Sequence, residues 1–125
     1  MILDTNALSA WADGNPSCRP FFEEARRIVV PVIVIGEYLY GIRQSRFRDR
    51  YESWLGSVMP HVEMASVTPT TADHYASLRL WLKSQGAPIP ANDLWIAAVV
   101  REYRLPLLSN HAHFDHCPDL QRLSF

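Results

Sequence analysis

The sequence has little of what marks secreted, membrane-spanning or nucleotide-binding proteins. Its two cysteines, Cys18 and Cys117, are too few for a disulfide framework and are most simply reduced thiols. The longest apolar run, residues 28–36, is far too short to cross a bilayer. Asp4 interrupts the start before an apolar stretch of signal length can form. The five glycines make no phosphate-binding loop. We therefore expect a soluble, cytoplasmic protein with no membrane association.

An excess of charge of one sign is also missing. Twelve basic and thirteen acidic residues leave a formal net charge of −1. Nothing global therefore favours nucleic-acid binding, which would need a local basic patch. The strongest patch is the arginine-rich segment 43–50, in which Arg43 lies at the end of a predicted helix and Arg46, Arg48 and Arg50 follow it. Alternatively, this segment is a solvated connection between helices whose charge is offset by Asp49 and Glu52.

The length and composition suit one domain spanning residues 1–125. A chain of 125 residues, 48% hydrophobic and 20% charged, can form a real core. Short apolar segments alternate with helical patterns along it. Strands are predicted at 2–3, 28–30, 105–108 and 120–123 and within 61–67, with helices between them. This alternation predicts an α/β fold with a central, mainly parallel sheet and right-handed crossovers.

Several helix boundaries follow from local signals. Thr5 or Asn6 is expected to cap the first helix. The β-branched segment before Pro31 favours a strand, and proline suits a first helical turn, so a helix is predicted from Pro31 to about Gln44. Two further helices are predicted from apolar stripes. One starts at Ser17 or Cys18 with the stripe Phe21, Phe22, Ala25 and Ile28; the other starts at Thr70 or Thr71, buries Ala72, Tyr75, Ala76, Leu78 and Leu82, and ends near Gly86.

Three acids lie in otherwise apolar segments. Asp4 follows a short strand, Glu37 lies mid-helix and Asp93 lies in the first turn of a buried helix. Buried carboxylates are costly and repel one another unless a cation neutralises them. Oxygen ligands alone favour Mg²⁺ or Mn²⁺ over zinc. Each acid also has a simpler explanation: Asp4 as a helix cap, Asp93 as a partner of the helix dipole, and Glu37 as a solvated group or a partner of Arg43.

Four motifs occur in a characteristic order along the chain. They are Ile2-Leu3-Asp4-Thr5-Asn6-Ala7-Leu8, Pro31-Val32-Ile33-Val34-Ile35-Gly36-Glu37-Tyr38 with Tyr40-Gly41-Ile42, Asn92-Asp93-Leu94-Trp95-Ile96-Ala97-Ala98, and Leu107-Leu108-Ser109-Asn110 with His113-Phe114. Together they resemble the PIN domain, and most closely the VapC-like toxins of type II toxin–antitoxin systems. The resemblance implies an α/β/α sandwich and Mg²⁺- or Mn²⁺-dependent cleavage of RNA. It also implies frequent homodimers and an antitoxin that covers the active site.

Carried onto this chain, the resemblance makes Asp4, Glu37 and Asp93 the first three acidic positions. Asp4 and Asp93 would hold the metal, and Glu37 would hold a water or act as a base. The fourth acid is missing, because His111 stands where the family usually has Asp, and Ser109 stands where it usually has Thr.

The loss of this charge could weaken a second metal site or alter the pH dependence, and Asn110 or Asp115 could compensate. His111 could instead act as a neutral ligand or a phosphate donor. A structural zinc site in the histidine-rich run 111–117 is disfavoured, since the spacing matches no standard zinc pattern. The candidate RNA contacts are Thr5, Asn6, Arg43, Arg46 and Ser109.

The sequence therefore predicts a metal-dependent endoribonuclease that is the toxin of a toxin–antitoxin pair. Its partners would be RNA, a cognate antitoxin and a second copy of the chain. One alternative is a catalytically weakened PIN-fold protein with a binding or regulatory role, because His111 replaces the usual acid. Another is a Mg²⁺-dependent phosphatase, which also uses clustered acids.

Overall fold

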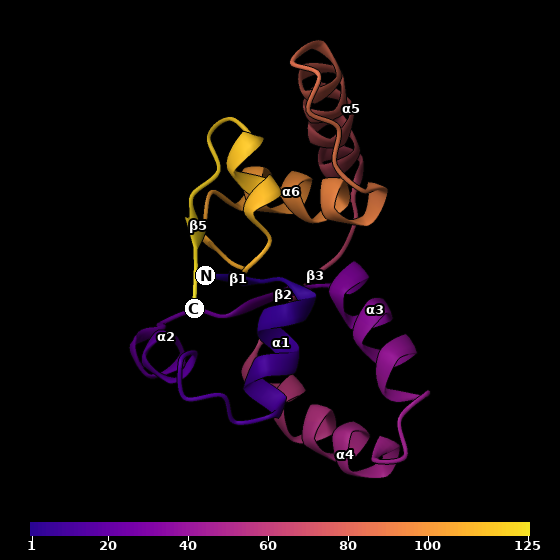
Figure 1. The fold of residues 1–125 in the computed structure, drawn as a ribbon, viewed down its shortest axis with the longest axis vertical. Coiled ribbons are helices and arrows are strands. Elements are labelled where there is room, and N and C mark those ends of the chain that lie inside the picture. The colour runs from indigo at the N-terminus through magenta and orange to yellow at the C-terminus, as the bar shows by residue number, and fades with distance from the viewer.

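A five-stranded parallel sheet lies at the centre of the computed structural model, which describes residues 1–125 (Figure 1). The strand order is β3-β2-β1-β4-β5, and every neighbouring pair is parallel. The strands are β1 (Ile2–Leu3), β2 (Val29–Pro31), β3 (Glu63–Ala65), β4 (Leu107–Leu108) and β5 (Arg122–Leu123). In the register of β1, Ile2 is paired with Val29 on one side and Leu107 on the other.

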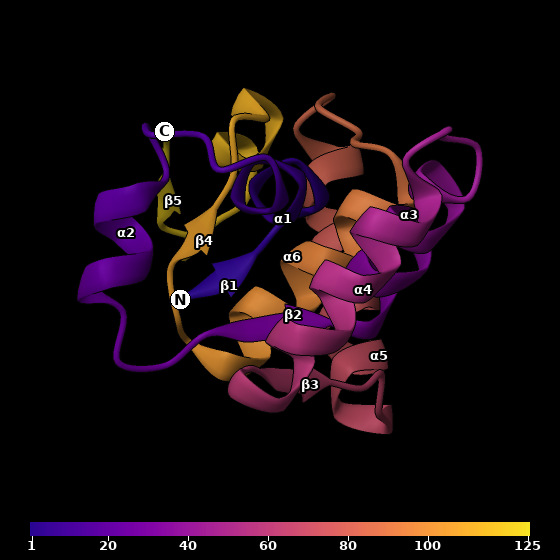
Figure 2. The same ribbon diagram turned by 90° about the horizontal axis from the view of Figure 1, so that it is seen from below.

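Helices cover both faces of this sheet. They are α1 (Thr5–Ala12), α2 (Arg19–Glu24), α3 (Val32–Ile42), α4 (Arg48–Val58), α5 (Pro69–Ser84) and α6 (Ala91–Tyr103), with short 3₁₀ turns η1 (Met59–His61) and η2 (Ala112–His116). Figure 1 shows α1, α3 and α4 on one face and α5 and α6 on the other, and Figure 2 views the molecule from the side of α1, α3 and α4. The predicted α/β/α sandwich with a parallel sheet is confirmed.

The core is centred on β1, β4 and α6. All four residues of β1 and β4 are fully buried, which explains why these strands are apolar throughout instead of alternating. Helix α6 is buried from Ile96 to Val100, as its apolar sequence predicts. No helix is both long enough and apolar enough to span a membrane.

Several helix boundaries differ from the sequence prediction, among them the start of α5, which begins at Pro69 and not at Thr70 or Thr71. Asp4 itself caps α1, in place of Thr5 or Asn6. Helix α2 ends at Glu24, because the chain becomes extended at Ala25 on its way to β2. The prediction that the apolar stripe of this helix extends through Ala25 to Ile28 is therefore wrong. Helix α3 begins after Pro31, which closes β2 with extended backbone, and it ends at Ile42.

The face predicted for α5 is only partly correct. Leu78 and Leu82 are buried, whereas Ala72 and Ala76 are exposed. Because α5 packs chiefly on α6 at the edge of the molecule, one narrow side of it is covered. The end of the helix is as predicted, since Gly86 adopts a left-handed φ of 66° just after the C-cap.

The strand order creates a switch point beside β1. The chain continues from β1 to β2 on one side, while β4 lies on the other side of β1. Open parallel sheets bind ligands in the crevice at such a point, outside the carboxyl ends of the strands. Asp4 directly follows β1 and Ser109 directly follows β4, so both lie at this crevice.

A buried threonine joins α5 to α6. Thr71 is fully buried, and its hydroxyl accepts a hydrogen bond from the Thr68 backbone N–H at 3.0 Å as part of a capping box. The same hydroxyl donates to Glu102 Oε2 at 2.5 Å. The Glu102 carboxylate thus lies at the N-terminus of α5, where negative charge is favourable.

We expect Thr71→Val to lower the free energy of unfolding by about 1–3 kcal/mol, because it leaves the partly buried partners of the hydroxyl unpaired. Urea denaturation followed by circular dichroism measures the change. Thr70→Val, at the exposed neighbouring position, is the matched control. Equal midpoints for the two variants would contradict the assigned role of Thr71.

Candidate metal centre

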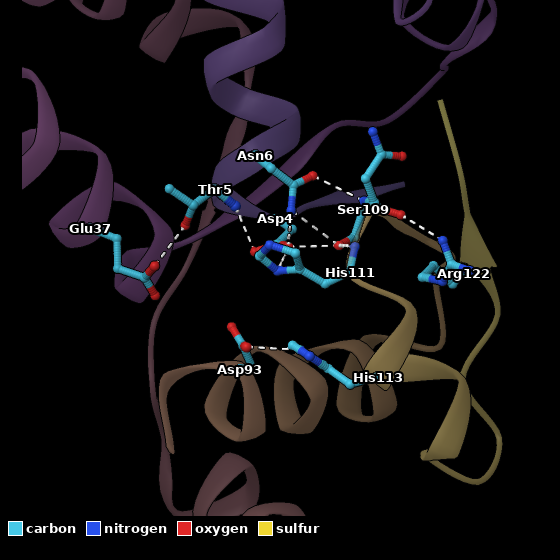
Figure 3. Close-up of polar contacts among 10 residues, drawn as sticks. Asp4, Thr5, Asn6, Glu37, Asp93, Ser109, His111, His113 and Arg122 are labelled. Atoms are coloured by element: carbon cyan, nitrogen blue, oxygen red, sulfur yellow. Dashed lines mark hydrogen bonds and ion pairs between the residues drawn. The ribbon is translucent and has the colours of Figure 1, made fainter. Parts of the chain in front are cut away.

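Asp4 is the most enclosed acid in the molecule, with 1% of its surface exposed. Its Oδ1 accepts the Thr5 backbone N–H at 2.7 Å, and its Oδ2 accepts Asn6 Nδ2 and Ser109 Oγ, each at 2.6 Å (Figure 3). The capping role explains why an acid is favoured here, because it meets the positive end of α1. Capping and a ligand role are compatible, since a carboxylate has about four lone-pair sites.

Asn6 and Ser109 tie the start of α1 to the segment after β4. Ser109 is fully buried, and its hydroxyl also accepts the His111 backbone N–H at 3.0 Å. Asn6 Oδ1 accepts the Asn110 backbone N–H at 3.1 Å. Residues far apart in sequence are thereby held around the Asp4 carboxylate. Thr5, Asn6 and Ser109 were predicted as RNA contacts; in the structure their side chains contact acids of the cluster.

Glu37 faces the same crevice from α3. Thr5 Oγ1 donates to Glu37 Oε2 at 3.1 Å, while Glu37 Oε1 is buried without any hydrogen-bond partner. Burial raises the pKa of Glu37, and the charges of Asp93 and Asp4 raise it further, whereas hydrogen bonding from the Thr5 and Asn92 side chains lowers it. The alternative pairing with Arg43 is not formed, because Arg43 pairs with Glu52 at 3.4 Å.

Asp93 completes the acidic group from the first turn of α6, with 8% of its surface exposed. Burial raises its pKa, the charge of Asp4 adds to the rise, and His113 and His111 act in the opposite direction. His113 Nε2 lies 2.8 Å from Asp93 Oδ2, but this buried nitrogen has no well-aligned hydrogen bond.

His111 occupies the fourth position beside the acids. Its Nδ1 lies 3.2 Å from Asp4 Oδ2, and half of its side chain is exposed. Ligand atoms of Asp93, His111 and His113 all lie within 4.8 Å of one another. Figure 3 shows the two imidazoles entering the crevice from the segment after β4, opposite Asp93 on α6.

Neither residue proposed to compensate for the missing acid reaches the cluster. Asp115 forms a two-pronged pair with Arg122, both distances being 2.8 Å. Asn110 Oδ1 accepts from Ser124 Oγ and from the Phe125 backbone N–H. The negative charge removed by His111 is therefore not replaced by either side chain.

Sequence reasoning missed two residues that shape this centre. His113 was identified only as part of the fourth motif, with no role in the site assigned to it, yet it contacts Asp93. The signal was its spacing of two from His111 within a short polar segment. Arg122 joins Asp115 and also donates to the Ser109 carbonyl at 3.1 Å. No local pattern indicates this role, because it depends on the pairing of β5 with β4.

The arginine-rich segment is partly neutralised. Arg43 and Arg48 both pair with Glu52, at 3.4 and 3.1 Å. The Arg46 guanidinium lies over the ring of Phe47, 4.7 Å from its centroid. The Arg50 guanidinium lies over the ring of Tyr51, 5.6 Å from its centroid. Arg46 and Arg50 are therefore the arginines of this segment that have no acidic partner within ion-pair distance.

The donor set at the crevice fits a divalent cation. Asp4, Glu37 and Asp93 extend toward the crevice from three different elements, and the charges of Asp4 and Asp93 act on Glu37 (Figure 3). The unpartnered Oε1 of Glu37 and the raised pKa values of Glu37 and Asp93 mark negative charge that the protein itself leaves uncompensated. A hard ion with oxygen ligands would provide that compensation.

Comparisons with known proteins agree with this geometry. The family model described as PIN domain matches residues 1–120. Ribonuclease VapC2 of Haemophilus influenzae is 29% identical over 112 residues, covering 88% of this chain and 85% of the relative. Ribonuclease VapC5 of Mycobacterium tuberculosis is 26% identical over 115 residues, covering 90% of this chain and 84% of the relative.

Solved structures share the fold. The crystal structure of VapBC2 from Rickettsia felis, bound to a promoter DNA fragment, superposes with a TM-score of 0.89 at 24% identity, covering 98% of this chain and 96% of that one. The structure of VapBC-1 from nontypeable Haemophilus influenzae superposes with a TM-score of 0.86 at 24% identity and the same coverage. With its sequence matched from residue 1 to 120, the chain belongs to the PIN-domain family.

Proposed function

We propose that the protein is a metal-dependent endoribonuclease, the toxin of a type II toxin–antitoxin pair. The observation that carries this proposal is the convergence of Asp4, Glu37 and Asp93 at the switch point of the sheet, with one buried carboxylate oxygen left unpartnered. Relatives that align over most of the chain bear the name ribonuclease VapC. The fold neighbours are VapBC toxin–antitoxin complexes.

Asp4 and Asp93 would hold Mg²⁺, for which Mn²⁺ can substitute, with Glu37 as the third ligand. When bound, such an ion polarises the scissile phosphate and makes water a stronger nucleophile. Glu37 lies near both other acids and would position the attacking water as a base. Attack by water does not need the 2′-hydroxyl of RNA. The products are therefore 5′-phosphate and 3′-hydroxyl ends.

Thr5, Asn6 and Ser109 serve this chemistry by orienting the acids. Asn6 and Ser109 share Asp4 Oδ2, and Thr5 contacts both Asp4 and Glu37. A ligand carboxylate with such outer partners keeps its orientation when an ion binds. Contact with the RNA backbone is then left to cationic groups, of which Arg46 and Arg43 are the candidates.

The partners follow from the same assignment. A cognate antitoxin would bind the toxin, because the neighbours are VapBC complexes. A homodimer stays a prediction from the family resemblance.

The rival function is a PIN-fold binding or regulatory protein weakened by His111, and a phosphomonoesterase is a weaker rival. Of these three candidate functions, only the nuclease cleaves an internal phosphodiester linkage of RNA.

We expect the purified protein to cleave an RNA pool with Mg²⁺ or Mn²⁺ and to lose this activity in EDTA. Glu37→Gln should lower the rate by about 10²–10⁴-fold, the usual contribution of a positioned acid–base group. Glu24→Gln, an exposed acid on α2, is the control. Sequencing of the ends should show 5′-phosphates.

Two results would contradict the nuclease assignment. Cleavage that persists in EDTA would exclude a metal-dependent site. Inactivity of the folded, antitoxin-free protein with every ion would favour the weakened protein, and recovery in His111→Asp would identify the cause. Release of phosphate from terminal phosphomonoesters with internal linkages intact would favour the phosphatase.

We expect Ser109→Ala to lower RNA cleavage by about 10–100-fold, because it removes a hydrogen bond that orients Asp4. The rate under saturating Mg²⁺ measures the loss. Ser124→Ala, an exposed serine near the same end of the sheet, should leave the rate unchanged. Full activity of Ser109→Ala would show that Asp4 does not depend on this contact.

A further inference from the structure

His111 and His113 lie beside the acidic cluster and bring imidazole nitrogens to it, which a site made of oxygen ligands alone does not need. His113 Nε2 is buried, lies 2.8 Å from Asp93 Oδ2 and has no aligned hydrogen bond. Neighbouring ligands of one ion with bonds of about 2.1 Å lie roughly 3.4 Å apart in a tetrahedral site and roughly 3.0 Å apart at a right angle. The nitrogen and the carboxylate oxygen, 2.8 Å apart, therefore need to separate by only a few tenths of an ångström to become neighbouring ligands of one ion.

His111 supplies a second nitrogen. The contact of its Nδ1 with Asp4 at 3.2 Å leaves Nε2 available for a ligand. A carboxylate on one imidazole nitrogen is the usual arrangement behind a histidine that binds metal through the other. The two rings lie 5.3 Å apart between centroids, and ligand atoms of His111, His113 and Asp93 fall within 4.8 Å.

The segment that carries these histidines is held in place on both sides. Phe114 follows the two histidines in sequence and precedes Asp115. Its side chain is fully buried and packs against the His113 ring, with 4.9 Å between the ring centroids. The Asp115 carboxylate is clamped by Arg122, which also donates to the Ser109 carbonyl. Asp93 is equally fixed in the first turn of α6. Small rotations of the imidazoles are then enough to close the group around an ion.

Ligand chemistry decides which ion this group takes. Imidazole nitrogen suits Zn²⁺, Co²⁺ and other transition metals, whereas Mg²⁺ prefers oxygen and gives up water reluctantly. We propose that Asp93, His111 and His113 form a mixed carboxylate–imidazole site that binds a transition-metal ion in preference to Mg²⁺. It lies next to the oxygen ligands Asp4 and Glu37. This inference rests on the proposed function only in that Asp93 is shared with the nuclease site.

Cobalt is the probe that reports the ligands directly. We expect the metal-free protein to bind Co²⁺ with visible d–d bands, and a tenfold excess of Mg²⁺ over Co²⁺ to leave these bands in place. Zn²⁺ should displace Co²⁺, and calorimetry in Mg²⁺-containing buffer should give the Zn²⁺ affinity. Bands that Mg²⁺ removes, or a protein that shows no Co²⁺ bands, would overturn the proposal.

Variants assign the signal to the two histidines. His113→Gln and His111→Gln should each weaken Zn²⁺ binding by more than about tenfold, since even an outer partner of a metal ligand contributes ~10–100-fold. His116→Gln, an exposed histidine in the same 3₁₀ turn, should bind Zn²⁺ as the unaltered protein does. An unchanged Zn²⁺ affinity in both His113→Gln and His111→Gln would contradict the site.

A further variant separates this inference from the nuclease assignment. His111→Asp replaces a nitrogen ligand by an oxygen ligand, so the ratio of Zn²⁺ to Mg²⁺ affinity should fall by at least about tenfold. Circular dichroism of each variant verifies folding. Histidine-dependent Co²⁺ binding without RNA cleavage would refute the nuclease alone. Cleavage with Mg²⁺ and histidine-independent Zn²⁺ binding would refute the mixed site alone.

Discussion

The structure depends on how the buried charge of Asp4 is accommodated. An ionised carboxylate removed from water costs several kcal/mol unless its oxygens are paired. Here the backbone of Thr5 and the side chains of Asn6 and Ser109 provide the pairing. These donors come from the first turn of α1 and from the segment after β4, on both sides of the switch point. Satisfying one carboxylate therefore also fixes the geometry of the crevice.

The other two acids are not satisfied in this way. Glu37 Oε1 is buried without a well-aligned hydrogen bond, and Asp93 Oδ2 lies 2.8 Å from a His113 nitrogen that is likewise poorly aligned. Their raised pKa values measure this unfavourable burial. Natural proteins accept such local conflicts at functional sites. Asp4 both caps α1 and takes part in the site. Glu37 and Asp93 have no such structural role, and a bound cation would explain their burial.

The sequence predicts most of the fold because the relevant signals are local. Apolar β1 and β4, the strand before Pro31 and the buried run of α6 are all visible in short windows. The three acids are visible for the same reason, since each interrupts an apolar segment. What sequence reasoning misses is long-range pairing. Arg122 reaches Asp115 because β5 pairs with β4, which no local pattern indicates. The position of His113 depends on the path of a five-residue 3₁₀ turn, which is too short to show a periodic pattern of apolar residues.

The histidine at the fourth position alters charge and ligand type together. A carboxylate there would add to the repulsion among Asp4, Glu37 and Asp93 and would also repel an approaching RNA phosphate. An imidazole does neither in any protonation state, and its nitrogens can donate a hydrogen bond or bind an ion. Asp115 and Asn110 are engaged elsewhere, so neither of these side chains restores the acid. The crevice thus combines an oxygen-rich side built on α1 and α3 with a nitrogen-rich side built on the segment after β4, and Asp93 on α6 lies where the two meet.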